Sequence, residues 1–330
     1  MKYIVTGAAG LIGSAIVHAL NKRGETDILA VDHLGATTEK WKNLRALRFT
    51  DYMEKEDFFA MLKDPGAVPA DTKAIIHMGA CSSTTETDAS YLVRNNYECT
   101  KALASLAVDR GIRFLYASSA ATYGDGSCGY SDDESGIERL RPLNMYGYSK
   151  QMFDLWAKRN GLLKQITGVK FTNIYGPNER HKGSMRSMVC RSYEQIRDTG
   201  KVRLFRSDRP DYADGEQKRD FLYVKDAADM VLFLLEDPRL CGLYNVGSGK
   251  AETWNDLAKA VFDAMGKPVN IEYIDMPDHL KGKYQYYTCA DMSKMKAAGY
   301  PGKVRSLHDA IEDDVVRYLL PGKYLGDWSE

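Results

Sequence analysis

A tyrosine and a lysine with a spacing suited to proton transfer stand near the middle of the chain. The segment Tyr146-Gly147-Tyr148-Ser149-Lys150 begins a predicted helix that continues through Phe153 and Trp156, so Tyr146 and Lys150 share one helical face. A phenol with an ordinary pKa of about 10 is a poor base at neutral pH. A neighbouring ammonium, or a cationic group on a cofactor, can lower that pKa because it stabilises the phenolate. Tyr146 is therefore a candidate acid/base.

Hydroxyl groups stand at the end of a predicted strand. The strand Arg113–Ser118 continues into Ser119-Ala120-Ala121-Thr122-Tyr123-Gly124. Open α/β sheets bind their ligands at the carboxyl ends of the strands. Ser119 is thus placed to hydrogen-bond a reacting oxygen, whereas Ala120 and Ala121 cannot transfer protons.

A glycine-rich turn lies near the N-terminus. The segment Gly7-Ala8-Ala9-Gly10-Leu11-Ile12-Gly13 follows the predicted strand Tyr3–Thr6 and opens a helix, Leu11–Lys22, with one apolar face. Glycines let backbone N–H groups approach a pyrophosphate, and the helix N-terminus adds a partial positive charge. Strand, turn and helix together predict a dinucleotide site.

The second predicted strand, Ile28–Asp32, ends in an acid that bears on cofactor choice. Asp32 can accept a hydrogen bond from a ribose 2′-hydroxyl, which favours NAD. Lys40 and Lys55 can instead neutralise a 2′-phosphate, which favours NADP. The residues alone leave both cofactors open.

Apolar strands alternate with helical patterns through the first half of the chain, as a parallel sheet requires. Besides the strands above, we predict Leu47–Phe49, Ala74–His77, Asp220–Val224 and Leu243–Val246, with helices at Lys55–Leu62, from about Asp226 and around Trp254–Met265. The expected fold is a Rossmann-type doubly wound α/β sheet with a smaller α/β substrate-binding lobe. Residues 1–172 and 219–247 would form the dinucleotide-binding domain, and residues 173–218 and 248–330 the substrate-binding domain.

Composition excludes several kinds of function. The 330 residues carry 45 Lys+Arg and 45 Asp+Glu, so no net charge favours nucleic acid or an anionic membrane. The six cysteines are scattered and form no zinc or redox pair, and no cluster predicts a metal. Without a signal peptide or a membrane-spanning run, the expected location is the cytoplasm.

Together these motifs resemble the extended short-chain dehydrogenase/reductase family over nearly the whole chain. The resemblance implies that Tyr146 is the acid/base, that Lys150 holds the cofactor ribose and tunes the phenol, and that Ser119 orients the reacting oxygen. The cofactor contacts that we expect are at Gly7, Gly10, Leu11, Ile12, Gly13, Asp32, His33, Lys40, Lys55, Met78, Gly79, Ala80, Cys81, Ser82, Asn95, Tyr146 and Lys150.

Three further stretches look like the ADP-L-glycero-D-manno-heptose 6-epimerases within that family. They are Gly79-Ala80-Cys81-Ser82-Ser83-Thr84-Thr85-Glu86, His181-Lys182-Gly183-Ser184-Met185 and Leu280-Lys281-Gly282-Lys283-Tyr284-Gln285. This resemblance implies inversion of C6 in an ADP-activated heptose by transient oxidation and re-reduction, for lipopolysaccharide inner-core synthesis. It also implies NADP rather than NAD and a homo-oligomer, typically a pentamer.

The same resemblance implies a second acid/base, because hydride must return to the opposite face of the C6 carbonyl. Tyr146 would serve one orientation of the sugar and Lys182 the other. The expected substrate contacts are Ser119, Asn173, Lys182, Ser184, Arg191, Phe205, Arg206, Ser207, Asp208, Arg219 and Tyr284, with Arg219 as a partner for the diphosphate.

Two departures from the pattern and two alternatives remain. Arg191 stands where a histidine is usual, and the loop from Arg206 to Gln217 is long, so a different sugar stays open. One alternative is an NAD(P)-dependent nucleotide-sugar 4-epimerase, which would leave Lys182 without a role. The other is a non-catalytic dinucleotide sensor, which would have no need of Tyr146 and Lys150. A dehydratase is disfavoured because Ala120 and Ala121 follow Ser119 where an acidic pair is needed.

Overall fold

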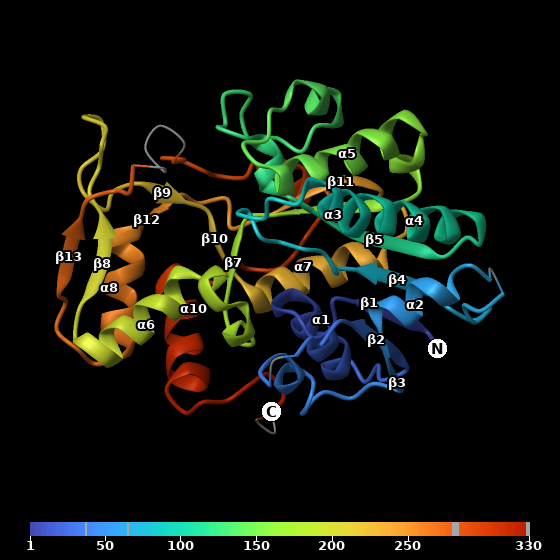
Figure 1. Ribbon diagram of the computed structural model, residues 1–330, viewed down its shortest axis with the longest axis horizontal. Coiled ribbons are helices and arrows are strands. Elements are labelled where there is room, and N and C mark those ends of the chain that lie inside the picture. The colour runs from blue at the N-terminus through green and yellow to red at the C-terminus, as the bar shows by residue number, and fades with distance from the viewer. Residues whose placement is uncertain (37, 65, 279–283, 328–330) are drawn as a thin grey trace.

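Seven parallel strands form the central sheet in the computed structural model (Figure 1). They lie in the order β11-β6-β5-β4-β1-β2-β3, and the pairings between neighbours are parallel. Their bounds are β1 Tyr3–Thr6, β2 Ile28–Asp32, β3 Asp51–Glu54, β4 Ala74–His77, β5 Arg113–Ser119, β6 Thr167–Phe171 and β11 Gly242–Val246. The strand order reverses between β1 and β4, and at such a point doubly wound sheets open a ligand crevice. The predicted fold class is confirmed.

The structure describes residues 1–36, 38–64, 66–278 and 284–327. Most of the segment Leu280–Gln285, on which the resemblance partly rested, therefore lies outside the described residues; Tyr284 and Gln285 lie within them.

Helices cover both faces of the sheet (Figure 1). One face packs against α1 (Leu11–Lys22) and α7 (Val224–Glu236), which contact each other. The other face packs against α2 (Lys55–Met61), the π-helix η2 (Val93–Glu98), α4 (Cys99–Asp109) and α5 (Met145–Arg159), and α3 (Ala89–Leu92) contacts η2 and α5. The apolar spacing predicted for α1 has its expected effect, since Leu11, Ile16 and Leu20 are all buried.

A smaller lobe stands beyond the carboxyl ends of the strands, on the left of Figure 1. Its own apolar core lies among α6 (Met188–Thr199), α8 (Trp254–Ala264), α10 (Leu307–Asp314) and the parallel pair β8 (Val202–Phe205) and β13 (Ile271–Ile274). The remaining elements are β7 Asn173–Tyr175, β9 Lys218–Arg219, β10 Phe221–Tyr223, β12 Glu252–Thr253, α9 Ser293–Ala297, and the short helices η1 Lys40–Asn43, η3 Ala120–Tyr123, η4 Glu134–Arg139, η5 Leu162–Lys164, η6 Arg180–Met185 and η7 Val315–Leu319.

One predicted strand is wrong. The segment Leu47–Phe49 is a loop, and the third strand is instead Asp51–Glu54. Leu47 is buried and Phe49 is partly buried against the core that contains α1 and α7, so these apolar side chains signal packing of a loop. β3 is an edge strand that pairs only with β2, and it therefore needs few apolar residues.

The proposed division into two domains stays a prediction, but the packing bears on where the C-terminal residues lie. Ala290, Met292 and Met295 belong to the core around α1 and α7, as do Tyr318 and Leu325. Segments on both sides of α10 thus pack in the core of the larger lobe, whereas β13 and α10 belong to the smaller lobe. Among the described helices, none is long and apolar enough to cross a membrane.

Candidate active site

The turn between β1 and α1 is shaped by glycines that no larger residue can replace. Gly7 has a φ of +67°, and a Cβ there would lie 2.7 Å from the backbone nitrogen of Gly79 at the end of β4. A Cβ on Gly13 would lie 1.9 Å from the carbonyl oxygen of Gly7. The turn therefore packs tightly at the N-terminus of α1, in the form that a pyrophosphate cradle takes.

A cavity of about 470 Å³ lies over this turn, at the reversal of strand order. We call it the dinucleotide cavity. Of the residues predicted to hold the cofactor, it is lined by Gly7, Gly10, Leu11, Ile12, Gly13, Asp32, Lys40, Met78, Ala80, Cys81, Ser82, Tyr146 and Lys150. The residues present thus fit a nicotinamide dinucleotide, with the glycine turn at one part of the cavity and Tyr146 at another.

Asp32 is held by protein groups on both oxygens. Oδ2 accepts from the Ala9 N–H at 2.7 Å, and Oδ1 accepts from the His33 N–H at 2.7 Å and from Lys40 Nζ at 2.5 Å. Lys40 also donates to the His33 carbonyl at 2.7 Å. An acid at this position is thus compensated by a cation that lines the same cavity.

Four predicted cofactor residues do not line the dinucleotide cavity. Lys55 Nζ donates to Asn95 Oδ1 at 2.9 Å, so the two side chains hold each other. The His33 side chain is mostly exposed and its Nδ1 lies 3.3 Å from Glu54 Oε2. Gly79 serves instead through its backbone, which closes against Gly7 and donates to Thr6 Oγ1 at 3.1 Å.

Tyr146, Lys150 and Ser119 come together at the dinucleotide cavity, as predicted. Asn144 caps α5 by accepting from the Gly147 N–H at 2.8 Å, which fixes the first turn that carries Tyr146. Lys150 is 4% exposed and its Nζ donates to the Ala117 carbonyl of β5 at 2.8 Å. Ser119 ends β5 and its Oγ accepts from the Ala121 N–H at 3.1 Å.

Within the protein, burial and neighbouring polar groups shift the pKa values of Tyr146 and Lys150 in opposite directions. Burial raises the pKa of Tyr146, and a hydrogen bond with Ser119 acts in the lowering direction. Burial lowers the pKa of Lys150 to about 8, although Asp154 acts to raise it. The lowered phenol pKa expected from the sequence is thus not a property of the protein groups by themselves.

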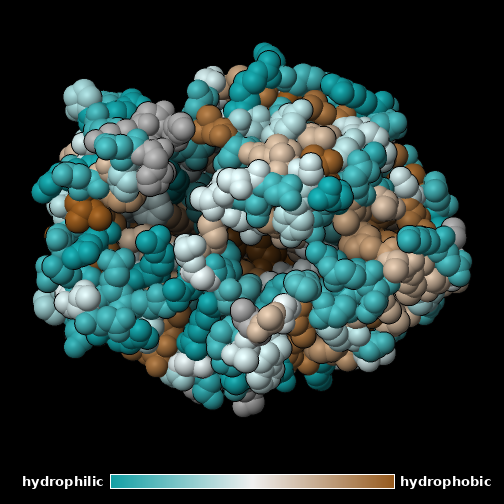
Figure 2. All heavy atoms as spheres, viewed as in Figure 1, coloured by the Kyte–Doolittle hydropathy of each residue, from teal (hydrophilic) through white to brown (hydrophobic). Residues whose placement is uncertain are grey.

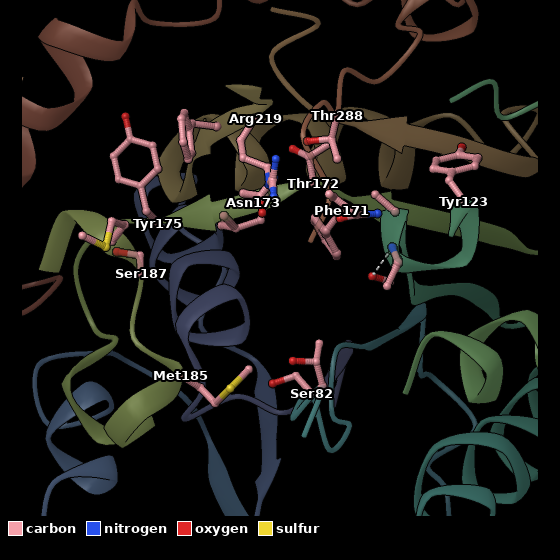
Figure 3. A pocket seen from close by; sticks show the side chains of 18 of the residues that line it. Ser82, Tyr123, Phe171, Thr172, Asn173, Tyr175, Met185, Ser187, Arg219 and Thr288 are labelled. Carbon is pink, nitrogen blue, oxygen red and sulfur yellow. Dashed lines mark hydrogen bonds between the residues drawn. The ribbon is translucent and has the colours of Figure 1, made fainter. Parts of the chain in front are cut away.

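A second cavity of about 630 Å³ adjoins the first and shares Ser82, Ser119, Tyr146 and Lys182 with it. We call it the sugar cavity. Tyr146 comes from α5 and Lys182 from η6, so two elements bring proton-carrying side chains to one space. Figure 3 shows Arg219, Asn173 and Thr172 together on one wall, with Met185 and Ser82 across the opening.

Arg219 is a buried cation with unusual surroundings. It is 7% exposed, and its guanidinium carbon lies 5.6 Å from the centre of the Trp254 ring and 5.0 Å from that of Tyr284. Its hydrogen bond goes to the Lys218 carbonyl, and no carboxylate of the described residues forms an ion pair with it. Burial lowers its pKa. A buried guanidinium without an acid partner favours binding of an anion.

A third cavity, of about 890 Å³, continues into the smaller lobe and shares Met188, Trp254 and Tyr284 with the sugar cavity. We call it the nucleotide cavity. The predicted substrate residues Ser184, Arg191, Phe205 and Tyr284 line it. Figure 2 shows the molecule hollowed near its centre, with apolar side chains at the bottom of the hollow.

Three predicted substrate residues line none of these cavities. Arg206 forms an ion pair with Asp275 at 3.0 Å. The Ser207 N–H donates to Asp214 within the long loop, and Asp208 is hydrogen-bonded by Tyr286. The polar groups of these three residues are thus engaged by Asp214 within the loop and by Asp275 and Tyr286 outside it.

Several lining residues were not predicted. They line the sugar cavity from positions far apart in the chain: Trp254 begins α8, Phe171 ends β6, and Thr172 and Thr288 lie in loops. Trp254 and Thr288 carry no local signal, because backbone pairing with the strand β9 brings them near Arg219. Phe171 and Thr172 could have been found, since they stand at the carboxyl end of β6 beside Ser119.

The comparisons with known proteins agree with this geometry. Residues 3–247 match the model of the NAD dependent epimerase/dehydratase family. The chain is 55% identical over 317 residues to ADP-L-glycero-D-manno-heptose-6-epimerase of Nitratidesulfovibrio vulgaris, covering 96% of this chain and 98% of that one. It is 45% identical to the Fusobacterium nucleatum enzyme of the same name, covering 96% and 97%.

Solved structures show the same fold. The ADP-L-glycero-D-manno-heptose-6-epimerase of Helicobacter pylori superposes with a TM-score of 0.79 at 22% identity, over 96% of this chain and 95% of that one. The UDP-N-acetylglucosamine 4-epimerase of Methanobrevibacter ruminantium superposes with a TM-score of 0.80 at 20% identity, over 97% and 98%. Because both 6- and 4-epimerases fit, the fold alone does not choose the sugar.

Proposed function

Because the chain belongs to the NAD dependent epimerase/dehydratase family, we propose that it inverts C6 of ADP-D-glycero-D-manno-heptose to give the L-glycero form. One observation carries the choice of chemistry: Tyr146 and Lys182 line the same sugar cavity, so two acid/bases are available to one carbon. A 4-epimerase would need only Tyr146, and a dinucleotide sensor would need neither side chain.

The protein groups divide the proton chemistry between them. In one orientation of the heptose, Tyr146 accepts the proton of the C6 hydroxyl as the carbon is oxidised, while Ser119 hydrogen-bonds the same oxygen. In the other orientation, Lys182 donates a proton to that oxygen as the carbon is reduced from its opposite face. Proton exchange with solvent returns both side chains to their starting states.

The dinucleotide cavity supports a tightly bound NADP. A nicotinamide bound there would supply the acceptor and donor of the C6 hydride, and the positive charge of the oxidised nicotinamide ring would lower the pKa of the Tyr146 phenol. Lys40 stands against Asp32 in this cavity, so it compensates the acid that would repel a 2′-phosphate and can itself contact that phosphate. NAD is the less favoured cofactor because both oxygens of Asp32 already accept protein hydrogen bonds.

The substrate nucleotide would follow the remaining two cavities. Arg219 is suited to the diphosphate, since it is buried between two rings without an acid. The nucleotide cavity beyond it, with Phe205 and Arg191, has room for the adenosine. The family resemblance further supports a homo-oligomer, typically a pentamer, acting in the cytoplasm in synthesis of the lipopolysaccharide inner core.

The test is a direct assay. The purified protein, with its bound nucleotide identified after release, is incubated with ADP-D-glycero-D-manno-heptose and separately with UDP-galactose, and the epimers are separated by chromatography. We expect conversion of the heptose only and release of NADP. Conversion of UDP-galactose would instead establish a 4-epimerase, and retention of cofactor without turnover of either sugar would favour the sensor.

A further inference from the structure

A fully buried ion pair lies behind the catalytic side chains and takes no part in the chemistry described above. Lys170 of β6 and Asp154 of α5 are both 0% exposed, and Lys170 Nζ lies 2.6 Å from Asp154 Oδ2. Two charges are costly to bury, and replacing such a pair by apolar residues is often neutral or stabilising. The pair therefore calls for a role besides stability.

Asp154 joins α5 to the strand that carries Ser119. The Tyr116 hydroxyl donates to its Oδ1 at 2.9 Å, and the Ser118 hydroxyl donates to its Oδ2 at 2.8 Å. Between them, the Ala117 carbonyl accepts from Lys150 Nζ at 2.8 Å. Three consecutive residues of β5 are thus tied to α5, immediately before Ser119.

Lys170 closes the network from the other side of Ser119. Its Nζ donates to Thr122 Oγ1 at 2.8 Å, and the Thr122 hydroxyl in turn donates to the Ser119 carbonyl at 2.7 Å. Lys170 also stands opposite Ser118 in the register of β5 with β6. Ser119 is therefore held through both Ser118 and Thr122, which contact the same buried pair.

Asp154 also lies one helical turn after Lys150, on the same face of α5. We propose that the Asp154–Lys170 pair is a positioning device: Asp154 places a carboxylate one turn from Lys150 and sets the place of Ser119, while Lys170 holds Asp154 by their ion pair. This role rests on the oxidation and reduction proposed for Tyr146.

The electrostatics agree with the geometry. Burial lowers the pKa of Lys150 to about 8, and Asp154 is the leading group that acts against burial. The other titratable groups that act on Lys150, or are acted on by it, are Cys81 and His77. Burial, and then the charge of Lys150, lowers the pKa of His77 to about 3, so that neutral imidazole adds no charge beside Lys150.

The test compares three variants. Asp154→Asn leaves Lys170 buried without its partner. The midpoint of thermal unfolding of this variant should therefore fall by roughly 10 °C or more. Asp154→Asn/Lys170→Met removes both charges and should recover most of that loss. Glu138→Gln is the matched control. It breaks an exposed ion pair with Lys158, which lies on α5 as Asp154 does.

The decisive readout is the titration of Lys150, followed by NMR of ¹³C-labelled lysine with the resonance assigned by its absence in Lys150→Met. Asp154→Asn and the double variant should both lower the pKa of Lys150 by about one unit or more, although only the first is unstable. Glu138→Gln should leave it unchanged. Above pH 8, kcat of Asp154→Asn and of the double variant should fall about tenfold for each unit by which the pKa of Lys150 is lowered. KM should change little.

A Lys150 titration that is unchanged in the stable double variant would overturn the proposal, because the pair would then be structural only. The NMR titration needs no substrate. If the wild-type protein fails to convert the heptose, the proposed function fails while the positioning role is still decided.

Discussion

At the scale of single residues, the unusual feature is the pairing of Tyr146 with Lys182 in one cavity. With acid/bases on two elements, the C6 oxygen has a proton partner in each of the two sugar orientations proposed for oxidation and reduction. Lys182 is partly buried and lies on a short helix with a kink at Gly183, where φ is +55°. That conformation suits glycine and turns the chain immediately after Lys182.

Lys182→Met should lower the rate of heptose epimerisation by roughly 10²- to 10⁴-fold, the usual contribution of a positioned acid/base. The cofactor should stay bound, because the glycine turn and Lys150 are intact. Chromatographic separation of the epimers measures the rate, and absorbance of the released nucleotide measures occupancy. Lys267→Met, at an exposed lysine, is the control. Full activity in Lys182→Met would show that Tyr146 serves both orientations.

Which site residues could be found from the sequence depends on how locally they are placed. The glycine turn, Asp32, Ser119, Tyr146 and Lys150 each stand at a strand end or in the first turns of a helix, and parallel topology brings those positions to one edge. Asp154 and Lys170 are equally close to the site but lie inside the network. Their types suggest surface charge, and only the packing of α5 on β5 and β6 reveals their burial.

At the scale of elements, β1, β4 and α4 are joined by a buried histidine. His77 Nδ1 lies 2.6 Å from the Thr6 hydroxyl, and Nε2 lies 3.0 Å from the Thr100 hydroxyl. Burial, and then the charge of Lys150, lowers the pKa of His77 from 6.5 to about 3. The folded protein therefore keeps this imidazole neutral, whereas the unfolded chain binds a proton below about pH 6.5.

The stability that His77 contributes is thus fully present above about pH 6.5 and is lost progressively as the pH falls toward 3. Its slope is at most about 1.4 kcal/mol per pH unit for one proton. In His77→Gln, denaturant unfolding between pH 6.5 and 4 should show a weaker dependence on pH than in the wild type. His308→Gln, at an exposed histidine, should not. Equal acid sensitivity in all three proteins would contradict the buried neutral state.

The elements of the first half were largely predictable, whereas β6, α6, β8, β13 and α10 were not predicted and the strand expected at Asp220–Val224 is β10, which pairs with β7 outside the central sheet. Buried central strands such as β1 and β4 are continuous apolar runs, because helices cover both of their faces. β3 has the sequence Asp-Tyr-Met-Glu and lies at the edge, so it lacks that signal. The loop before it contains the apolar residues instead, and that misled the prediction of Leu47–Phe49.

At the scale of the whole molecule, the three cavities form one series between the larger and the smaller lobe, since neighbouring cavities share walls. Trp254 and Thr288 line the sugar cavity because of long-range pairing: β12, just before Trp254, pairs with the strand β9 that carries Arg219, and the Thr288 N–H donates to the Lys218 carbonyl at 3.2 Å. Sequence patterns describe local elements, so they cannot report such contacts.

The hydrogen on C6 itself should not exchange with water, because in the proposed reaction it moves only between the sugar and the dinucleotide. With deuterium at C6 of the substrate, the product should retain the label nearly completely, as measured by mass spectrometry, because the oxidised sugar stays beside the group that carries the hydride. Unlabelled substrate in D₂O, which serves as the control, should give a product without deuterium on carbon. Uptake of solvent deuterium at carbon would point to proton abstraction rather than oxidation.

The common wall formed by Ser82, Ser119, Tyr146 and Lys182 has a kinetic consequence. A sugar nucleotide seated against these side chains would stand beside the dinucleotide. We therefore expect ordered loading, with the dinucleotide first and retained while successive sugar nucleotides enter and leave. A compound that spans the dinucleotide and sugar cavities should accordingly bind only to protein that has lost its dinucleotide.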